Sequence, residues 1–250
     1  MDKYGIIGFP LGHSFSRGFF TEKFAHEGID AQYLNFEIPD VTMLKDVLRD
    51  NPELRGLNVT LPHKQAVIPL LDELSDEARE IGAVNVIRVR GGKLKGFNSD
   101  IIGFTESIKP LLQQQHTKAL ILGTGGASKA IRVGLSRLGI HWIYVSRQLS
   151  NCQIDNCQIV KYSDLTPEVM AEYTVIVNCS PVGMFPNVDQ APAIPYECLT
   201  PKHLLFDLVY NPEDTLFIKK GREQGAKGKN GLEMLHLQAV ASWRFWQQES

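Results

Sequence analysis

Hydrophobic and polar positions alternate with two different periods along the first hundred residues. Compact apolar runs predict β-strands at 4–8, 32–38 and 56–60. Between these runs, apolar residues recur every three or four positions, which predicts helices at 15–28 and 41–50. Strand, helix, strand, helix, strand is the order of a parallel α/β sheet.

Two shorter apolar runs follow, at 84–89 and 93–96, and Gly91-Gly92 lies between them. Paired glycines supply the positive φ angles that a tight turn between two strands requires. We therefore expect a β-hairpin added to the first sheet.

A second alternation of strands and helices begins after the polar stretch 113–116. Apolar runs predict further strands at 119–122, 140–145, 158–162, 174–178 and 204–208. A helix is expected at 129–138, closed by Gly139. The terminal segment from Leu232 to about Trp246 is amphipathic and must pack against one of the two units. The predicted fold class is α/β, with two αβ domains.

Composition narrows the class of protein. Of the 250 residues, 43% are hydrophobic and 22% are charged, which is typical of a folded globular chain. The net charge of −2 provides no attraction for nucleic acid or an acidic membrane surface. Gly5, Gly8 and Pro10 interrupt the apolar N-terminal run, and no stretch of about eighteen apolar residues occurs. We therefore expect a cytoplasmic protein without a signal peptide or membrane span.

The four cysteines are Cys152, Cys157, Cys179 and Cys198. They are too few and too clustered for a disulfide-stabilised secreted scaffold. Cys152 and Cys157 lack suitably spaced partners for a metal site. We expect reduced, structural thiols and no metal.

The segment Gly-Thr-Gly-Gly-Ala-Ser at 123–128 follows an apolar strand and opens a helix. Glycines in this position let the backbone approach a pyrophosphate, whose charge lies at the helix N-terminus; the alternative is a turn that binds nothing. The next strand ends in Ser146-Arg147, without the acidic residue that binds the ribose hydroxyls of NAD. A guanidinium suits a 2′-phosphate, which predicts NADP unless Arg147 is only a solvated surface charge.

Clustered polar side chains stand at strand ends in the first half of the chain, among them Ser14, Asn58, Asn85 and Asp100. Ligands of open α/β sheets bind outside the carboxyl ends of the strands. Uncharged donors together with Lys64 and Asp100 would suit a small polyhydroxylated molecule. Taken singly, each of these side chains could instead cap a helix or satisfy a turn.

Seven segments carry a more specific signal: G-F-P-L-G-H-S-F-S, G-L-N-V-T-L-P-H-K, G-A-V-N, G-F-N-S-D, G-T-G-G-A-S, N-C-S-P-V-G-M and G-L-E-M-L-H-L-Q-A. In this order, and over nearly the whole chain, they closely resemble the shikimate dehydrogenase family. The resemblance implies an oxidoreductase acting on a CH–OH group. It would catalyse the reversible reduction of 3-dehydroshikimate to shikimate with NADPH, in chorismate and aromatic amino acid biosynthesis.

The resemblance also implies roles for individual residues. Lys64 is the catalytic residue and Asp100 its partner. The implied substrate contacts are Ser14, Ser16, Asn58, Thr60, Asn85, Asp100, Tyr210 and Gln238. Ser14 and Ser16 hold the substrate carboxylate, with help from Tyr210. The implied cofactor contacts are Gly123, Thr124, Gly125, Gly126, Ala127, Ser146, Arg147, Leu208, Gly231 and Asp76.

A lysine and a carboxylate are chemically sufficient for this reaction. Hydride transfer to a ketone leaves an alkoxide, and an ammonium group both stabilises that charge and supplies the proton. His63, with His13 behind it, is the rival acid–base group, because an imidazole titrates nearer neutrality. Neighbours on an extended segment point to opposite faces, so we expect only one of His63 and Lys64 to enter the site.

Domain boundaries follow from the same interpretation. We expect a substrate-binding domain with a mostly parallel sheet at 1–102, rejoined by the terminal helix at 230–250, and a Rossmann-type NADP-binding domain at 103–229. The protein is expected to bind a small-molecule substrate in a cleft, as a monomer or homodimer. Three alternatives remain: a quinate/shikimate dehydrogenase of relaxed substrate or cofactor preference, a catalytically silent dinucleotide sensor, and a one-carbon folate dehydrogenase.

Overall fold

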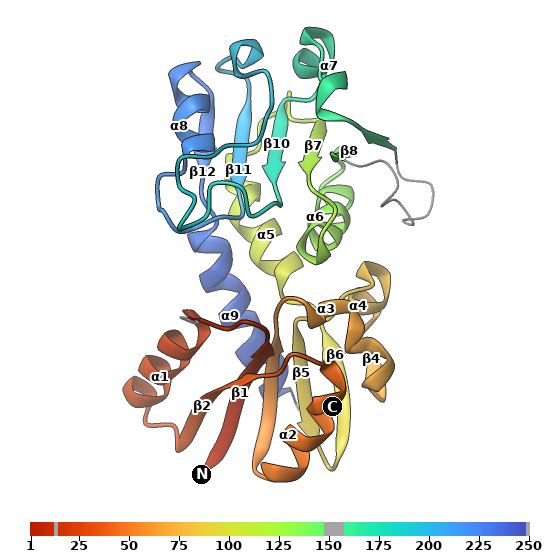
Figure 1. The fold of residues 1–250 in the computed structure, drawn as a ribbon, viewed down its shortest axis with the longest axis vertical. Coiled ribbons are helices and arrows are strands. Elements are labelled where there is room, and N and C mark those ends of the chain that lie inside the picture. The colour runs from red at the N-terminus through yellow and green to blue at the C-terminus, as the bar shows by residue number, and fades with distance from the viewer. Residues whose placement is uncertain (13–14, 148–157, 249–250) are drawn as a thin grey trace. The chain divides into compact units, whose positions relative to one another are not determined.

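The computed structural model describes residues 1–12, 15–147 and 158–248. The chain divides into two compact units, which we call unit 1 (Met1–Ser99 with Gln238–Ser250) and unit 2 (Asp100–Leu237). Each unit contains one six-stranded sheet with helices packed on it (Figure 1). The predicted α/β class is confirmed. The units meet at 99/100 and 237/238, whereas the sequence predicted domain boundaries at 102/103 and 229/230. The domain boundaries stay a prediction.

Unit 1 is built on a mostly parallel sheet in the order β2-β1-β3-β5-β6-β4. Its strands are β1 (Asp2–Gly8), β2 (Ala31–Glu37), β3 (Leu54–Val59), β4 (Glu73–Leu74), β5 (Val86–Arg90) and β6 (Lys93–Phe97). Its helices are α1 (Phe15–Glu27), α2 (Leu44–Asp50), α3 (His63–Ala66) and α4 (Asp76–Ile81), with 3₁₀ turns η1 (Val41–Met43) and η2 (Ile68–Leu70). Strand β5 is antiparallel to both β3 and β6. Gly91 and Gly92 have positive φ angles in the β5–β6 turn, which confirms the predicted hairpin.

The C-terminal part of the last helix, α9 (Leu232–Gln247), packs on the sheet of unit 1. Trp246 is buried among aromatic side chains, and its Nε1 donates a hydrogen bond to the Ile87 carbonyl at 3.1 Å. A Cβ atom on Gly56 would stand 2.4 Å from the Trp246 ring, so β3 needs a glycine at this position. The terminal helix therefore docks on the first sheet, as predicted.

Unit 2 is an all-parallel, doubly wound sheet in the order β12-β11-β10-β7-β8-β9. Its strands are β7 (Lys118–Leu122), β8 (His141–Val145), β9 (Ile159–Val160), β10 (Val175–Asn178), β11 (Leu204–Asp207) and β12 (Lys227–Lys229). Its helices are α5 (Asp100–Ile108), α6 (Gly126–Arg137), α7 (Pro167–Glu172) and α8 (Leu216–Glu223), with 3₁₀ turns η3 (Lys109–Leu111), η5 (Tyr162–Asp164) and η6 (Tyr196–Cys198). From β7 the chain winds to one side through β8 and β9, and β10 to β12 continue on the other side of β7. Ligands of such sheets bind at this switch point, between the ends of β7 and β10.

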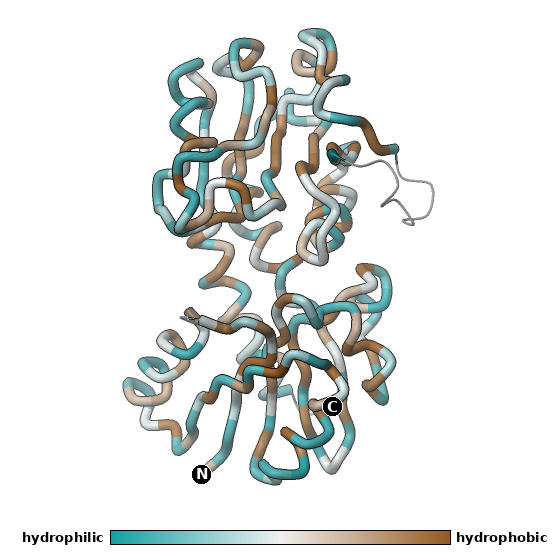
Figure 2. The backbone as a smooth tube through the Cα atoms, viewed as in Figure 1, coloured by the Kyte–Doolittle hydropathy of each residue, from teal (hydrophilic) through white to brown (hydrophobic). Residues whose placement is uncertain are grey.

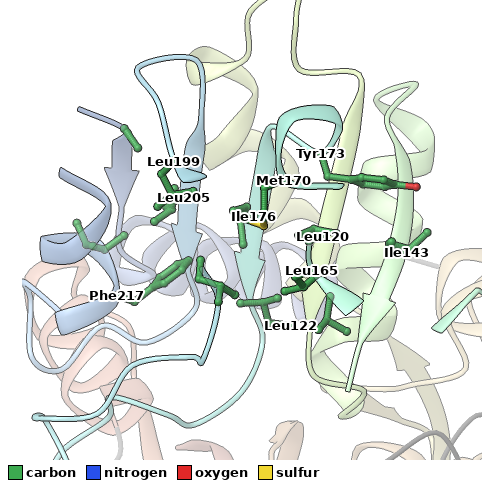
Figure 3. Close-up of a cluster of buried hydrophobic side chains, with 14 residues drawn as sticks. Leu120, Leu122, Ile143, Leu165, Met170, Tyr173, Ile176, Leu199, Leu205 and Phe217 are labelled. Carbon is green, nitrogen blue, oxygen red and sulfur yellow. The ribbon is translucent and has the colours of Figure 1, made fainter. Parts of the chain in front are cut away.

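Hydrophobic side chains pack on both faces of the unit 2 sheet. Leu120, Leu122, Ile176 and Leu205 point from β7, β10 and β11 into one hydrophobic cluster, which Phe217 of α8 also joins (Figure 3). The hydropathy colouring shows the same pattern, with hydrophobic strands in the middle of unit 2 and hydrophilic stretches in the surrounding loops (Figure 2).

Among the described residues, no helix has the length and hydrophobicity to cross a membrane.

Candidate functional site

Lys64 lies on a one-turn helix, α3, that follows the end of β3. The extended segment predicted here is wrong, because His63 N donates a hydrogen bond to the Thr60 carbonyl at 2.9 Å and starts a helical turn. His63 is 3% exposed, and its Nε2 donates to the Ile38 carbonyl at 2.7 Å. Consecutive helix positions point about 100° apart. The His63 ring is therefore committed to the interior of unit 1, whereas Lys64 is only half-buried.

Asn58, near the end of β3, is the centre of a buried hydrogen-bond network in unit 1. Its Oδ1 accepts a hydrogen bond from the Tyr33 hydroxyl at 2.8 Å. Its Nδ2 donates to Ser242 Oγ at 3.0 Å and to the Asn85 carbonyl at 3.3 Å. Both amide hydrogens of Asn58 are thus used within the protein, and the side chain holds β3, α9 and the loop before β5 together.

Asn85, Ser99 and Gln238 continue this network. Asn85 Nδ2 donates to Ser99 Oγ at 3.0 Å, and Ser99 N donates back to Asn85 Oδ1 at 2.7 Å. Gln238 Oε1 accepts from Ser99 Oγ at 3.2 Å and from Asn85 Nδ2 at 3.5 Å. Since both neighbours approach the oxygen, the Gln238 amide is oriented, and its Nε2 makes no hydrogen bond to a described residue. This NH₂ group is available to a ligand.

Of the hydroxyl side chains predicted to contact substrate, Ser16 joins this network in unit 1. Ser16, in the first turn of α1, is buried and hydrogen-bonds to the Tyr33 hydroxyl. Burial raises the pKa of Tyr33 well above its usual value, which keeps the phenol protonated. Thr60 is half-buried after β3, and a Cβ on Gly8 would stand 2.4 Å from its methyl group. Ser14 and His13 lie outside the described residues.

The two predicted carboxylates each begin a helix. Asp100 is buried at the start of α5, and Asp76 is exposed at the start of α4, where Ser75 Oγ caps the helix. A helix N-terminus favours negative charge, so an acidic residue suits each position. Asp76 belongs to unit 1, whereas the glycine turn belongs to unit 2.

The glycine turn lies between β7 and α6, at the switch point of the unit 2 sheet. Gly123 has a φ of +100°, and a Cβ there would stand 3.5 Å from Ser180, just after β10. Gly125 is the N-cap of α6 with no side-chain cap, and nothing lies within 4 Å of where its Cβ would be. Helix α6 begins at Gly126, earlier than the predicted Lys129, so the turn itself forms the helix start. Thr124 and Ala127 are half-buried within this segment.

Ser146 and Arg147 follow the end of β8. Ser146 N donates to the Val160 carbonyl at 3.0 Å, which fixes the start of this loop against β9. Arg147 is exposed, and its charge partly offsets the increase that burial causes in the pKa of Tyr162. A guanidinium at this strand end, with no acidic residue at 141–147, fits a 2′-phosphate.

Leu208 and Tyr210 follow β11, and Gly231, which follows β12, lies against Leu208. A Cβ on Gly231 would stand 2.3 Å from the Leu208 carbonyl oxygen, so only glycine allows this approach of two backbones. Gly231 N donates to the Val209 carbonyl at 3.2 Å. Leu208 and Tyr210 are half-buried.

Sequence reasoning missed the side chains that hold these groups in place. Tyr33 and Ser242 join the network of unit 1, and Asp207 and Asn178 form a second network in unit 2, described below. A signal existed for Ser242, which is a hydroxyl on the apolar face of the terminal helix. Asp207 carried a similar signal, since it ends the otherwise apolar run Leu204–Phe206.

The cysteines and possible metal ligands add no further site. Burial and the nearby Asp207 raise the pKa of the Cys179 thiol, and burial also raises the pKa of Cys198. Both thiols are free; Cys152 and Cys157 lie outside the described residues. Within the described ranges, no three His, Cys, Asp or Glu side chains are grouped to hold a metal ion.

Comparison with known proteins gives matches over nearly the whole chain. A family model described as "Shikimate dehydrogenase substrate binding domain" matches residues 6–87. A shikimate dehydrogenase (NADP(+)) of Desulforamulus reducens is 36% identical and aligns over 97% of this chain and 88% of its own. The protein of the same name from Halothermothrix orenii is 38% identical and aligns over 97% of this chain and 89% of its own.

Solved structures match the same length of chain. Shikimate 5-dehydrogenase from Thermus thermophilus, in complex with NADP(H) and shikimate, has a TM-score of 0.85 and 31% identity and covers 99% of this chain and 94% of its own. Quinate dehydrogenase from Corynebacterium glutamicum, in complex with NAD, has a TM-score of 0.88 and 27% identity. It covers 98% of this chain and 93% of its own.

Proposed function

The chain belongs to the shikimate dehydrogenase family, and on this premise we propose that it catalyses the reversible reduction of 3-dehydroshikimate to shikimate with NADPH, using Lys64 for proton transfer. The observation that carries the proposal is the open glycine turn before α6, at the switch point between β7 and β10. A glycine turn that opens a helix at the switch point of a doubly wound sheet is the place where this fold binds a dinucleotide.

The residues of unit 2 fit NADP. The backbone N–H groups at the start of α6 face no side-chain cap, and the absence of Cβ atoms at Gly123 and Gly125 lets a pyrophosphate approach. We assign the pyrophosphate to 123–127, the 2′-phosphate to Ser146 and Arg147, and the nicotinamide end to Leu208 and Gly231. Bound NADPH supplies the hydride that reduces the substrate ketone.

Lys64 acts on the oxygen of that ketone. Its ammonium group stabilises the negative charge that develops on the oxygen and donates the proton that completes the alcohol; in the reverse direction the neutral amine takes the proton back. Asp100 acts with Lys64 on the same substrate and accepts a hydrogen bond from a substrate hydroxyl. The hydrogen bond between His63 and Ile38 supports Lys64 over His63, because it leaves the imidazole in a structural role.

The remaining polar groups orient the substrate ring. Ser14, Ser16 and Tyr210 bind its carboxylate, and Thr60, Asn85 and Gln238 bind its hydroxyls. Gln238 Nε2 is suited to this role because the network fixes its amide and no described residue uses the donor. Asn58 acts through Asn85 and Ser242, since its own donors are engaged. Asp76 stays a prediction as a cofactor contact.

The quinate/shikimate alternative is not favoured. Relatives 36% and 38% identical to this chain are named shikimate dehydrogenase (NADP(+)), whereas the quinate dehydrogenase structure is 27% identical. A site rejects a near-isostere strongly only where the extra or missing polar group leaves buried partners unpaired. We therefore expect measurable but slower oxidation of quinate.

One spectrophotometric assay tests the function. The purified protein should oxidise NADPH with 3-dehydroshikimate and reduce NADP with shikimate, with lower kcat/KM for quinate and for NAD. Equal or faster turnover of quinate would establish the relaxed alternative. Tight NADPH binding with no turnover of either acid would identify a sensing protein and contradict the proposal. The predictions of a cytoplasmic location and of a monomer or homodimer remain to be tested.

A further inference from the structure

Asp207, the last residue of β11, is a fully buried carboxylate for which the proposed chemistry has no role. Its Oδ1 accepts hydrogen bonds from Asn178 Nδ2 at 2.9 Å and from Val209 N at 3.0 Å. Its Oδ2 accepts from Thr215 Oγ1 at 2.7 Å. In the described part of the chain no cation pairs with it. A buried charge without a countercharge is costly, so a carboxylate here needs a compensating function.

One arm of this network reaches the glycine turn. Asn178, at the end of β10, uses its Oδ1 to accept hydrogen bonds from Ser180 N at 3.0 Å and Ser180 Oγ at 2.7 Å. Ser180 is the residue that a Cβ on Gly123 would contact at 3.5 Å. The chain from Asp207 through Asn178 to Ser180 therefore fixes the turn after β10 against the turn after β7.

The other arm holds the segments after β11. Val209 N binds the carboxylate directly, and the Val209 carbonyl accepts a hydrogen bond from Gly231 N. The Gly231 backbone in turn lies against the Leu208 carbonyl. Thr215 is the N-cap of α8, with its Oγ1 accepting from Ile218 N at 3.4 Å while its proton goes to Asp207.

We propose that Asp207 is a positioning residue for the nicotinamide end of the dinucleotide. It holds the Ser180 turn on one side and the Leu208–Gly231 contact on the other, through Asn178, Val209 and Thr215. The inference rests on the proposed function, which assigns Leu208 and Gly231 to the nicotinamide end.

A carboxylate suits this position because every neighbour donates to it. Asn178 Nδ2 and Val209 N can only donate, and Thr215 Oγ1 donates here as well. In Asp207→Asn one side-chain oxygen becomes an NH₂ group. In one orientation the NH₂ group faces the N–H donors of Asn178 and Val209. In the other orientation it faces the Thr215 hydroxyl, whose proton can then no longer point at this side chain. The variant thus keeps the shape of the side chain and removes its complementarity.

The test compares the two halves of the cofactor. For wild type, Asp207→Asn and Thr215→Val, the dissociation constants of NADPH and of adenosine 2′,5′-bisphosphate are measured, together with kcat and the KM for shikimate. We expect NADPH to bind about tenfold more weakly and kcat to fall about 10- to 100-fold, because the nicotinamide is misplaced. Binding of adenosine 2′,5′-bisphosphate should change less than about twofold, since this ligand lacks the nicotinamide end.

Two further variants control for folding. Thr215→Ser keeps the hydroxyl group, so it should restore kcat and NADPH affinity to near wild type. Thr166→Val removes the corresponding N-cap of α7, where Thr166 Oγ1 accepts from Val169 N at 3.4 Å, and has no bond to Asp207. It should change neither affinity.

Two results would overturn the inference. In the first, Asp207→Asn and Thr215→Val bind NADPH and adenosine 2′,5′-bisphosphate as wild type does and keep the wild-type kcat. In the second, both ligands weaken to the same extent, which indicates a general loss of fold in unit 2. A wild-type protein without shikimate turnover contradicts the proposed function instead, and the ratio of the two affinities still tests Asp207.

Discussion

Unit 1 and unit 2 both bury polar side chains beneath the ends of their central strands, but they use different chemistry. In unit 1 the network consists of uncharged amides and hydroxyls, with Asn58 and Asn85 at its centre. In unit 2 a carboxylate, Asp207, collects three donors. Each network supports groups that we assign to ligand binding, substrate in unit 1 and cofactor in unit 2.

The difference shows how each network responds to its surroundings. Donors and acceptors in an uncharged network can match one another at any pH between the titration ranges of acids and phenols. A buried carboxylate is a strong acceptor but is costly to keep ionised, and burial raises the pKa of Asp207 to about 6. The contribution of the unit 1 network to stability should therefore not change in mild acid, whereas the contribution of Asp207 in unit 2 should change with pH.

Loss of the Lys64 amine should have the largest effect and should be confined to the chemistry of unit 1. We expect Lys64→Ala to lower kcat by about 10²- to 10⁴-fold, because proton transfer and charge stabilisation are lost together in the transition state. The KM for shikimate should change much less, and NADPH affinity not at all. Steady-state kinetics and NADPH titration measure these values. Near-normal turnover would contradict the assignment of proton transfer to Lys64.

The pH dependence of stability should separate the two networks. A raised carboxyl pKa means that the folded state holds the proton more tightly than the unfolded state. The resulting stabilisation is complete below the unfolded pKa near 4 and is lost as the pH rises through the folded pKa of about 6. The nearby titratable groups, Cys179 and Tyr196, have raised pKa values and stay neutral in this range.

A shift from 3.8 to about 6 is about two pKa units, or about 3 kcal/mol. Asp207→Asn lacks this titration, so its free energy of unfolding relative to wild type should rise by up to that amount between pH 4 and pH 7. Urea denaturation at several pH values measures the difference. A difference that stays constant with pH would mean that Asp207 does not titrate as assigned.

Removal of the Ser242 hydroxyl should weaken unit 1 by a smaller amount that does not depend on pH. In Ser242→Ala, Asn58 Nδ2 loses its partner in the interior, which should cost about 1–3 kcal/mol and increase the KM for shikimate. Ser107→Ala is the matched control, because Ser107 is also a buried helix serine but, within the described part of the chain, its hydroxyl bonds only to the Phe104 carbonyl. It should cost less than about 1 kcal/mol. Equal costs for the two variants would show that the network contributes nothing beyond a helix hydroxyl.

The smallest effect should come from the exposed Arg147, and it should appear only with the phosphorylated cofactor. We expect Arg147→Ala to increase the KM for NADP about tenfold, the worth of one charge-assisted hydrogen bond, with little change for NAD. Steady-state kinetics with both cofactors give the comparison. Equal increases for NADP and NAD would remove the 2′-phosphate assignment.

Much of the fold could be predicted from local pattern. The central strands, the hairpin at Gly91-Gly92 and the amphipathic terminal helix all lie where periodicity and turn residues place them. The errors occurred where a short segment carries few repeats of any period. The single turn of α3 is four residues long, which is too short for the 3.6-residue period to distinguish it from an extended loop.

The candidate site was predictable where its residues form contiguous motifs. In the glycine turn and in the segment around Lys64, the functional groups are neighbours in the sequence. The supporting side chains do not, because their bonds join positions far apart in the chain. Asn58 and Ser242 are 184 positions apart, and Asn178 and Asp207 are 29 apart.

The sequence by itself determined which elements form and which residue types stand at their ends, since hydrophobic period, turn residues and strand-end polar groups are local properties. The tertiary structure alone decided which side chains orient the Gln238 amide, that the ring of His63 turns inward, and that Asp207 receives three donors with no countercharge among the described residues. Hydrogen-bond complementarity between distant segments exists only after the chain has packed.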